Sequence, residues 1–586
     1  MKKVLLIAAL LAATAAAGSI TQPLRDELAL AGSDQLIPVL IKPVGRADVD
    51  YINQVAANMT PQERREFAVE VMQETAQQTQ QPILDALGEF PGDRVQDIHT
   101  NWIVNAVGCY ATPEVIMAMA SRDDVLWVDI KTFEDILIEP VDQREATGEE
   151  LGRANAWGVD KINAPDVWAM GYEGEGIIVS VVDTGVNYNH VDLHNQMWHD
   201  TDSGYHYGWD FMDNDGDPMD SYGHGTHCAG SVASNGNAGT TCGVAPQTTI
   251  MALRVGTTFG DEQDVWDAFE FSIEYEADII TTSLGWPQSQ NPDRQTWREG
   301  EENILAAGIH HAIAAGNESG DPNNWGDIRT PGDCPPPWLH PDQTTTGDLT
   351  ACVTVGATDS GDNLASFSSL GYSTWMYDSP WFDYPDTDPE IGLIDPDICG
   401  PGVNITSCDY ANPSGYTTMS GTSMATPHLA GCMSLMLDAN PNLTNAQMDS
   451  LLEVTALDLG ATGKDNYYGS GRVDIYQAVL GALELVGIEE GTGAAVGQPG
   501  LQLSRVTPNP VRGSALITLY SGTPTDATIS VYDLAGRNIA TVHSGDVPRG
   551  SNSFSWTVPG GMSNGVYFIK ASTPFGETTQ RMTVLR

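Results

Sequence analysis

Three residues have the types and the places needed for nucleophilic catalysis: Asp183, His224 and Ser423. Asp183 follows a run of β-branched residues at 177–182, which predicts a buried parallel strand. Reactive groups of open α/β sheets gather at the carboxyl ends of such strands. His224 and Ser423 each open a segment with the apolar pattern of a helix. Because a serine hydroxyl is a poor nucleophile without an adjacent base, the chemistry depends on the fold bringing the three together.

Each motif has a plainer interpretation when it stands alone. The Asp-Thr-Gly of residues 183–185 could be only a turn, and the Gly-Thr-Ser of residues 421–423 could be only a helix cap. His224 and His227 could bind a metal as a pair, or the second histidine could serve the structure. Only the combination of motifs therefore decides which chemistry they carry.

That combination resembles the subtilisin-like serine proteases. The order Asp183, His224, Ser423 is the order of this family and differs from that of chymotrypsin and the α/β-hydrolases. The spacings of 41 and 199 residues fit as well. A fourth element, residues 314–317, matches the segment that supplies the family's oxyanion asparagine.

The resemblance implies a role for each residue. His224 would take the proton of Ser423 and return it to the leaving amine, while Asp183 holds the imidazole. Asn317 and the backbone N–H of Ser423 would donate to the oxyanion. The residues carried over as substrate-binding are Ser283, Leu284, Gly285, Ala314, Ala315 and Gly316. In this family, residues like 283–285 pair with the substrate through backbone hydrogen bonds, which implies an extended polypeptide as substrate. The alternative is that residues 283–285 are an ordinary strand end.

An acidic stretch at residues 210–220 precedes His224. Dense carboxylates in a turn suit Ca²⁺, although Pro218 and His224 stand where an EF-hand would need glycine and glutamate. The stretch resembles a calcium loop of subtilisin relatives; the alternative is a solvated acidic turn. The implied ligands are Asp210, Asp215 and Asp217, with the Met219 carbonyl.

A second calcium site is implied by two further segments. Residues 189–193 resemble the family segment whose aspartate binds calcium, here Asp192. Asn237 lies in the loop that would complete this site. That loop departs from the family pattern because it carries Cys242 and several glycine and threonine residues.

The elements that must position these residues follow from periodicity. Residues 157–484 alternate strands with helices, which predicts an α/β core with a parallel sheet flanked by helices. Residues 33–135 are typical of a small α+β unit, with strands expected at 36–41, 102–107 and 125–130. After a linker at 485–500, residues 501–586 alternate in the strand manner and predict a small all-β sandwich.

The two flanking units have resemblances of their own. Residues 19–150 are similar in position, size and element order to a subtilisin-type propeptide, with residues 139–156 as an exposed linker where processing would occur; the alternative is a permanent domain. The last unit is similar to secretion-associated sorting domains of bacterial exoenzymes. The residues that carry this likeness are 508–510, 531–537 and 565–568, and the alternative is a substrate-binding or spacer module.

The start of the chain and its cysteines bear on export. Residues 1–18 have a basic start, a short apolar run and small residues, which is the pattern of a secretory signal peptide rather than of a membrane span. An oxidising compartment then favours disulfides, with Cys334–Cys352 and Cys399–Cys408 as candidates. Cys228 and Cys432 lie in helix-like apolar runs and are expected to be buried thiols.

Charge excludes whole classes of partner. The 586 residues include 26 Lys and Arg against 78 Asp and Glu, a net charge of −52, which repels nucleic acid and anionic membranes. Residues 151–484 hold 48 of the acidic and 8 of the basic residues. The tail after residue 484 has 7 basic and 6 acidic residues, so it could meet a secretion machinery or a cell surface without this repulsion.

Two hypotheses follow. The first is a secreted, monomeric, calcium-stabilised serine endopeptidase that is made as a precursor and cuts polypeptides through an acyl-enzyme. The second is a non-enzymatic surface-binding protein on a lapsed protease scaffold, which the presence of Asp183, His224, Ser423 and Asn317 disfavours.

Overall fold

The structure is a computed structural model of the 586-residue chain. The residues it describes are 18–131, 133–290, 292–319, 328–335, 350–375, 378, 384, 392–489, 501–503, 511–521, 525–532, 537–548, 550–560, 562, 565–573 and 576–584. The chain divides into two compact units, Met1–Glu484 and Leu485–Arg586. The expected signal peptide lies almost wholly outside the described residues, as does the linker after Glu489 up to residue 500.

The first part of unit one, called here the N-terminal subdomain (residues 18–131), has a five-stranded sheet in the order β1-β5-β2-β4-β3. Its strands are β1 (Ser19–Ile20), β2 (Ile37–Pro43), β3 (Val95–Asn101), β4 (Ala106–Ala111) and β5 (Val125–Ile130). Its helices are α1 (Gln22–Leu30), α2 (Val49–Val55), α3 (Pro61–Leu87) and α4 (Pro113–Ala120). Of the strand expected at 102–107, residues 102–105 form a tight turn after β3, with Ile103 and Val104 buried in it, and residues 106–107 begin β4.

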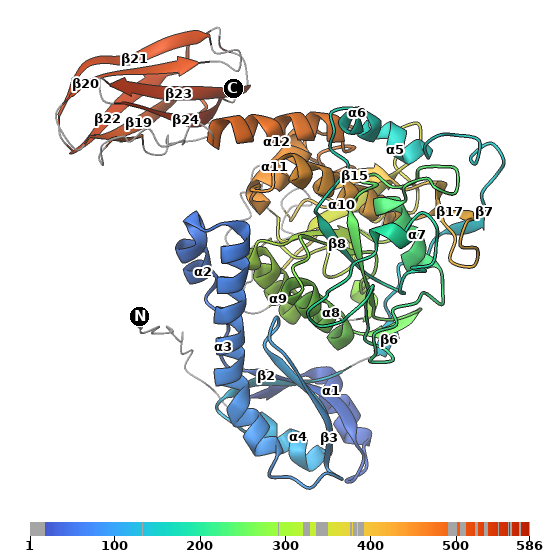
Figure 1. The fold of residues 1–586 in the computed structure, drawn as a ribbon. Coiled ribbons are helices and arrows are strands. Elements are labelled where there is room, and N and C mark those ends of the chain that lie inside the picture. Colours follow the sequence, from blue (N-terminus) through green and yellow to red (C-terminus); the bar gives the residue numbers. More distant parts are fainter. Residues whose placement is uncertain are drawn as a thin grey trace. The chain divides into compact units, whose positions relative to one another are not determined.

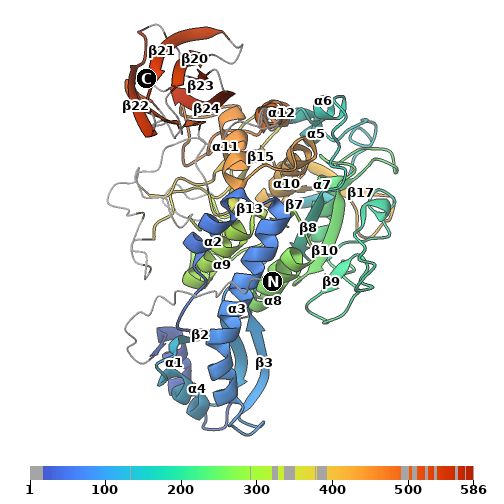
Figure 2. The same cartoon turned by 60° about the vertical axis from the view of Figure 1, so that its left-hand side comes forward.

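The longest helix of this subdomain begins where its sequence dictates. Thr60 and Glu63 form a capping box at the start of α3, and Pro61 occupies the first helical position. These residues satisfy backbone N–H groups that a helix start leaves free, and the fixed φ of proline suits that position. Helix α3 runs beside α9 (Arg294–Ala307) of the larger core, as both views show (Figure 1 and Figure 2).

The core of unit one is a seven-stranded parallel sheet in the order β15-β14-β13-β12-β8-β10-β9, as expected for an α/β core. The strands are β8 (Ile178–Asp183), β9 (Gly208–Asp210), β10 (Thr249–Arg254), β12 (Ile279–Thr282), β13 (His310–Ala314), β14 (Val353–Thr358) and β15 (Ile398–Pro401). The longer helices around it are α7 (His224–Ala233), α8 (Glu262–Glu274), α9, α10 (Thr422–Ala439), α11 (Asn445–Thr455) and α12 (Ile475–Glu489). Helix α10 packs along β12, β13, β14 and β15, and the hydroxyl of its first residue, Thr422, accepts from the N–H of Gly316 just after β13, which places its N-terminus at the carboxyl edge of the sheet.

Short strands attach other parts of the chain to this core. Strand β6 (Phe133–Asp135) pairs with β11 (Phe259–Asp261), and β7 (Asp142–Glu145) pairs with β17 (Tyr416–Ser420), which also pairs with β16 (Ile405–Cys408). Residues 139–156 were expected to be a free linker, yet part of this stretch is a sheet strand. Its side chains are exposed, as the polar sequence predicts, because the pairing uses only its backbone. Short helices α5 (Trp157–Lys161) and α6 (Ala164–Trp168) follow it.

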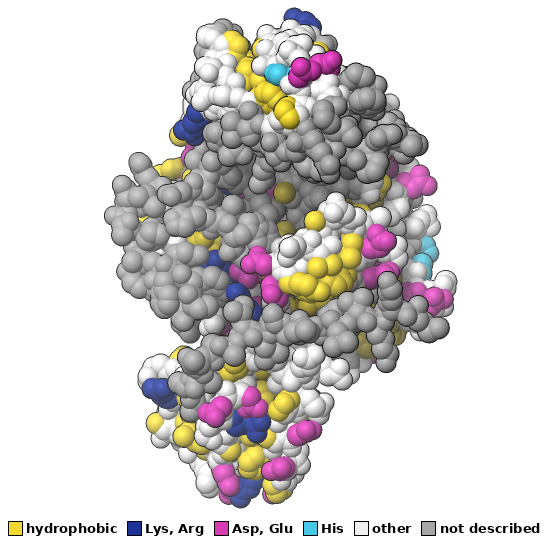
Figure 3. Space-filling view, turned by 90° about the vertical axis from the view of Figure 1, so that its left-hand side faces the viewer, with side chains coloured by type: hydrophobic (Ala, Val, Ile, Leu, Met, Phe, Trp, Pro, Cys, Tyr) yellow, Lys and Arg dark blue, Asp and Glu magenta, His cyan; other side chains and the backbone are white. Residues whose placement is uncertain are grey.

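Salt bridges and hydrogen bonds join the N-terminal subdomain to helices α8 and α9. The buried Lys42 pairs with Glu299 at 2.7 Å, and His99 lies 2.8 Å from Asp267. The backbone N–H groups of Trp102 and Ile103 both donate to the Glu270 carboxylate. Basic groups and N–H donors of the subdomain therefore meet carboxylates of the α/β core. The outer face of the subdomain instead shows acidic and basic side chains interspersed (Figure 3).

The second unit consists of antiparallel strands in two sheets, as predicted. One sheet has the order β18-β19-β22 and the other β21-β20-β23-β24. The strands are β18 (Leu501–Leu503), β19 (Ser514–Ser521), β20 (Thr525–Tyr532), β21 (Asn538–Val547), β22 (Gly550–Thr557), β23 (Gly565–Thr573) and β24 (Gly576–Val584). Alternate residues such as Ile517, Leu519, Ile529 and Val531 are buried in its core, which is what one inward face per strand requires.

All eight cysteines are buried and unbonded. The pairing of Cys399 with Cys408 expected from the sequence does not form, because the first belongs to the seven-stranded sheet and the second to the three-stranded sheet. Cys334 and Cys352 are likewise unbonded thiols, whereas Cys228 and Cys432 are buried as expected. In the described part of the chain, no helix is both long enough and apolar enough to cross a membrane.

Candidate active site

The fold brings the predicted aspartate and histidine into direct contact. Asp183 is the last residue of β8 and His224 is the first residue of α7. The Nδ1 atom of His224 lies 2.8 and 3.0 Å from the two carboxylate oxygens of Asp183. Helix α7 approaches the strand this closely because residue 225 is glycine; a Cβ there would lie 2.1 Å from the Gly185 carbonyl oxygen.

Burial and charge act in opposite directions on His224. Burial lowers its pKa, but the Asp183 carboxylate raises it, and the net effect is a pKa well above the ordinary histidine value. The N–H of Thr184 donates to Asp183 at 2.7 Å and helps to fix the carboxylate. The Asp183 carboxylate therefore stabilises the imidazolium, which is the form a base takes after it has accepted a proton.

The sequence did not point to Asp220, which organises the start of α7. Its carboxylate accepts hydrogen bonds from the N–H groups of Tyr222, Gly223 and Thr226 and from the Thr226 hydroxyl. The Thr184 hydroxyl also donates to Asp220 at 3.0 Å and thereby ties the helix to β8. A carboxylate just before a helix is the signal that could have revealed it, since such residues satisfy free N–H groups there.

Asn317 has the orientation needed for an oxyanion donor. Its Oδ1 atom accepts hydrogen bonds from the N–H of Thr422 at 2.9 Å and from the Thr422 hydroxyl at 3.0 Å. These two contacts turn its Nδ2 group toward the cleft, where it donates to the Glu139 carbonyl at 2.9 Å. Asn317 therefore lies at the start of α10, beside Ser423, which is the second residue of that helix.

Residues 136–141, called here the cleft segment, lie across this place like a bound peptide. Leu137 pairs with Leu284 in an antiparallel bridge, and the N–H of Gly285 donates to the Ile136 carbonyl at 2.9 Å. On the other side, the N–H of Val141 donates to the Ser420 carbonyl at 2.8 Å. The predicted substrate strand, residues 283–285, thus pairs with an extended polypeptide. Three of the segment's side chains, Ile136, Leu137 and Ile138, are almost fully buried.

The hydroxyl of Ser423 is turned toward the cleft segment. It donates to the Ile138 carbonyl at 2.9 Å, and the Ser283 carbonyl lies 3.3 Å from the same hydroxyl. Among the described residues, the buried Nε2 atom of His224 has no hydrogen-bond partner. The serine and its expected base are therefore not hydrogen-bonded while the segment occupies the cleft.

The two expected pocket walls are bridged by a residue that the sequence did not single out. The Nη1 atom of Arg329 donates to the Gly285 carbonyl at 2.8 Å and to the Leu137 carbonyl of the cleft segment at 3.3 Å. Its backbone N–H donates to the Ala315 carbonyl at 2.9 Å. Glu318 holds the guanidinium by accepting from Nε and Nη2 at 3.0 and 2.6 Å. Arg329 thus touches both walls and the bound backbone.

Two further residues near the predicted triad serve structure. The sulfur of Cys228, one turn after His224, lies 3.8 Å from its Nδ1 atom and 3.4 Å from the Ser423 carbonyl. His227 lies 3.0 Å from the Ile405 carbonyl through Nε2, and burial lowers its pKa to about 3. A neutral, buried His227 bound to a backbone carbonyl supports the structural interpretation and not a metal pair.

The acidic loop after β9 uses its first aspartate for an ion pair with the protein itself. Asp210 is paired with Arg254, and its other oxygen accepts from the N–H groups of Met212 and Asp213. Asp215 accepts from a backbone N–H, and Asp217 accepts from the Tyr188 hydroxyl at 2.7 Å. Each of these carboxylates accepts hydrogen bonds from the protein, and a Ca²⁺ site at Asp210, Asp215 and Asp217 stays a prediction.

At the second implied calcium site, the aspartate also accepts hydrogen bonds from the protein. The buried Asp192 accepts from the Tyr416 hydroxyl at 2.7 Å, the Ser234 hydroxyl at 2.9 Å and the Ala238 N–H at 2.6 Å. The side chain of Asn237 donates to the Val191 carbonyl at 3.3 Å. Three donors therefore engage the Asp192 carboxylate, and the calcium site at Asp192 and Asn237 stays a prediction.

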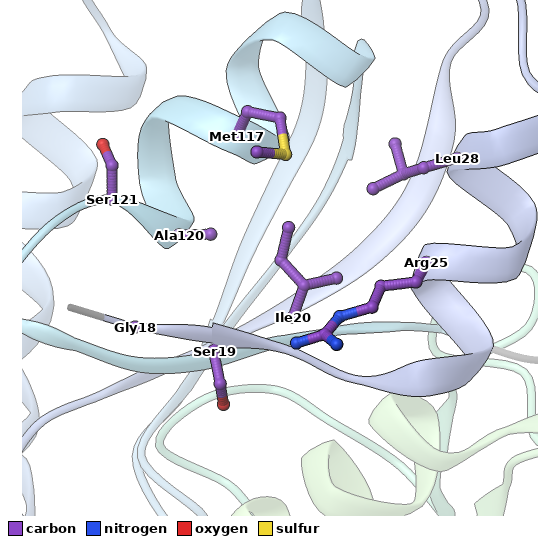
Figure 4. Close-up of a pocket in the computed structure, with 8 residues that line it drawn as sticks. All are labelled: Gly18, Ser19, Ile20, Arg25, Leu28, Met117, Ala120 and Ser121. Carbon is purple, nitrogen blue, oxygen red and sulfur yellow. The ribbon is translucent and has the colours of Figure 1, made fainter. Parts of the chain in front are cut away.

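A pocket of about 460 Å³ lies in the N-terminal subdomain (Figure 4). Its apolar lining includes Ile20, Leu28 and Met117, and Arg25 is its charged side chain. None of the lining residues belongs to the motifs described above, so this pocket is not the active site.

Comparison with known proteins agrees with this geometry. The family model described as "Subtilase family" matches residues 174–471, and that described as "Secretion system C-terminal sorting domain" matches residues 505–585. The chain therefore belongs to the subtilase family. It is a serine endopeptidase of that family and, by its sorting domain, a secreted or cell-surface protein.

Individual relatives are similar to slightly more than half of the chain. The chain is 33% identical over 332 residues to Thermitase of Thermoactinomyces vulgaris, covering 55% of this chain and 95% of that protein. It is 31% identical over 326 residues to a Subtilisin of Bacillus pumilus, covering 55% and 98%. It is 30% identical over 340 residues to Subtilisin E of Bacillus subtilis (strain 168), covering 57% and 74%.

Proposed function

We propose that Asp183, His224 and Ser423 form the catalytic triad and cut polypeptides through an acyl-enzyme. One observation carries the proposal: the cleft segment presents backbone carbonyls both to the Ser423 hydroxyl and to the Asn317 amide. The nucleophile and the oxyanion donor thus contact neighbouring carbonyls of one bound peptide backbone, which supports attack on a peptide held in this cleft.

The chemistry begins when the Ser423 hydroxyl leaves the Ile138 carbonyl and turns to Nε2 of His224. His224 then takes the hydroxyl proton while the serine oxygen attacks the peptide carbon. Asp183, bound to Nδ1, stabilises the imidazolium. Asn317 donates to the oxyanion, together with the N–H of Ser423. The imidazolium gives its proton to the leaving amine, and water releases the acyl group by the reverse sequence.

We further propose that the N-terminal subdomain is a propeptide and the chain a precursor. The cleft segment supports this, because it connects that subdomain to the core through the active site. The two peptide bonds nearest the catalytic groups flank Glu139, so we expect the first cut there. This lies at the start of residues 139–156, the stretch in which the sequence predicts processing.

The test is the Ser423→Ala variant of the full chain, followed by mass spectrometry of its ends. We expect no peptide hydrolysis and an intact bond on both sides of Glu139, whereas the parent chain is cut within residues 138–140. Complete processing of the purified variant would overturn the precursor proposal. A fluorophosphonate probe tests the triad separately: absence of label on Ser423 in the processed protein would favour the lapsed scaffold.

We also propose that residues 1–18 are removed as a signal peptide. We propose in addition that a secretion machinery recognises the last unit. The sorting-domain match supports the second. Mass spectrometry of the protein recovered outside the producing cells measures both ends at once. A chain that retains residue 1 there would contradict the signal peptide.

A further inference from the structure

A short hairpin before β9 places two histidines opposite each other. His199 and His206 pair in an isolated antiparallel bridge. The N–H of Tyr207 donates to the Trp198 carbonyl at 2.8 Å, and the N–H of Asp200 donates to the Tyr205 carbonyl at 3.0 Å. These two bonds flank the histidine pair without passing through it. In such a non-hydrogen-bonded pair the two side chains come closest together on one face.

The two imidazole rings approach each other through their Nδ1 atoms. The Nδ1 atoms of His199 and His206 are 3.2 Å apart, and the ring centroids are 5.3 Å apart. Both side chains are exposed to solvent. The pair is therefore open to ions from outside and lies on a backbone that already holds both rings.

This separation matches what one tetrahedral zinc ion needs. Zn–N bonds of about 2.0–2.1 Å at a tetrahedral angle place two ring nitrogens roughly 3.3–3.4 Å apart. We propose that His199 and His206 form a transition-metal site that binds Zn²⁺ through both Nδ1 atoms, with water completing the coordination. Binding requires each neutral ring to carry its proton on Nε2, so the ring that has its proton on Nδ1 changes tautomer through water and both Nδ1 lone pairs become free for the ion.

The charge of the surroundings favours a bound cation. Residues 151–484 carry a net charge of −40, which raises the local concentration of cations. Asp200 lies beside the pair, and its carboxylate accepts from the N–H groups of Asp202 and Ser203, which fixes the turn.

Contacts between side chains join the hairpin to the acidic loop, so metal binding at the hairpin should also stabilise that loop. The Tyr207 ring lies 5.2 Å from that of His199 and stacks on Tyr188 at 4.0 Å. The Tyr188 hydroxyl donates to Asp217, seven residues before His224. An ion that holds the hairpin therefore stabilises a continuous chain of contacts from the surface to the loop that precedes α7.

The site differs in kind from the calcium sites implied by the sequence. Its ligands are imidazole nitrogens, which suit Zn²⁺, Cu²⁺ and Ni²⁺ and bind Ca²⁺ poorly. The carboxylates of Asp210, Asp215 and Asp217 are not part of it. Calcium should therefore neither occupy the pair nor compete with zinc.

The experiment is calorimetric titration of ZnCl₂ into the full chain carrying Ser423→Ala, with and without excess CaCl₂. We expect one more bound zinc in this protein than in its His206→Ala derivative, and a zinc-dependent rise in Tm that the derivative lacks. His194→Ala, a neighbouring histidine outside the pair, is the matched control and should keep both. Equal zinc binding by all three proteins, or loss of binding in the His194 variant alone, would overturn the proposal.

A second derivative guards against misfolding. His199→Asn keeps a polar side chain at the other member of the pair and should lose the same single zinc. Without zinc, the Tm of both derivatives should equal that of the parent. Displacement of the bound zinc by CaCl₂ would show that oxygen ligands, and not the histidine pair, hold the ion.

Discussion

Asn317 illustrates how one side chain can be oriented by a neighbour that takes no part in the chemistry. Thr422 holds the amide oxygen with two hydrogen bonds, so that the amide nitrogen has to face the cleft. Replacing Asn317 with alanine should lower kcat by roughly 10²–10³ with little change in KM, because the donor acts mainly on the oxyanion. Steady-state kinetics on a peptide substrate measures this.

The matched control is Thr422→Val. It removes the hydroxyl that helps to hold the amide but leaves the backbone N–H in place, so its loss of kcat should be much smaller. A loss as large as that of Asn317→Ala would mean that Thr422 itself contacts the reacting group.

Arg329 makes a different contribution, since it binds backbone and does not touch the reacting carbonyl. Arg329→Ala should raise KM by about tenfold and leave kcat nearly unchanged, because a charged donor to the bound peptide is lost. Arg329→Lys should be intermediate, since lysine keeps the charge but not the fork that reaches Gly285, Leu137 and Glu318. A fall in kcat at constant KM would contradict this role.

At the scale of elements, the junction of β8 with α7 shows what the sequence could and could not predict. Asp183 and His224 were predictable because each lies at a fixed point of a regular element. Asp220 was predictable only as a carboxylate that precedes a helix. Arg329 was not predictable, because the backbone carbonyls that it binds are brought near by the fold. Strand β7 lies in the stretch 139–156 that was predicted to be an exposed linker, and its pairing was missed because backbone pairing leaves no periodic pattern in exposed, polar side chains.

The acidic loop between β9 and α7 gives a prediction about metal removal. Since Asp210 is neutralised by Arg254, we expect that exchanging Ca²⁺ for EGTA leaves the Tm unchanged. Differential scanning calorimetry of the full chain carrying Ser423→Ala measures this. A fall of several degrees, reversed by CaCl₂, would instead support the calcium prediction made from the sequence.

At the scale of the whole first unit, the interface of the N-terminal subdomain with α8 and α9 should depend on pH. Burial raises the pKa of Glu302, which pairs with Arg46, to about 7, and raises that of Glu270 well above its ordinary value. The hydrogen bond between His99 and Asp267 raises the pKa of His99. All three groups therefore bind protons more tightly in the assembled state than after release.

Protons accordingly stabilise the assembled state at low pH, and this stabilisation is lost as pH rises from about 5 through about 7. Each proton given up makes release of the subdomain up to about tenfold more favourable per pH unit. The lag before activity appears in freshly cut protein should thus shorten from pH 5 to pH 8. Glu302→Gln should flatten this dependence, and a lag that lengthens with pH would contradict it.

The cleft segment has a consequence for how maturation scales with protein amount. Because the segment is covalently joined to the core, its local concentration at Ser423 is set by the chain and not by the solution. Dilution cannot lower it. The first cut of the proposed precursor would therefore follow a rate independent of protein concentration, so that a single molecule exported alone could still become an active protease.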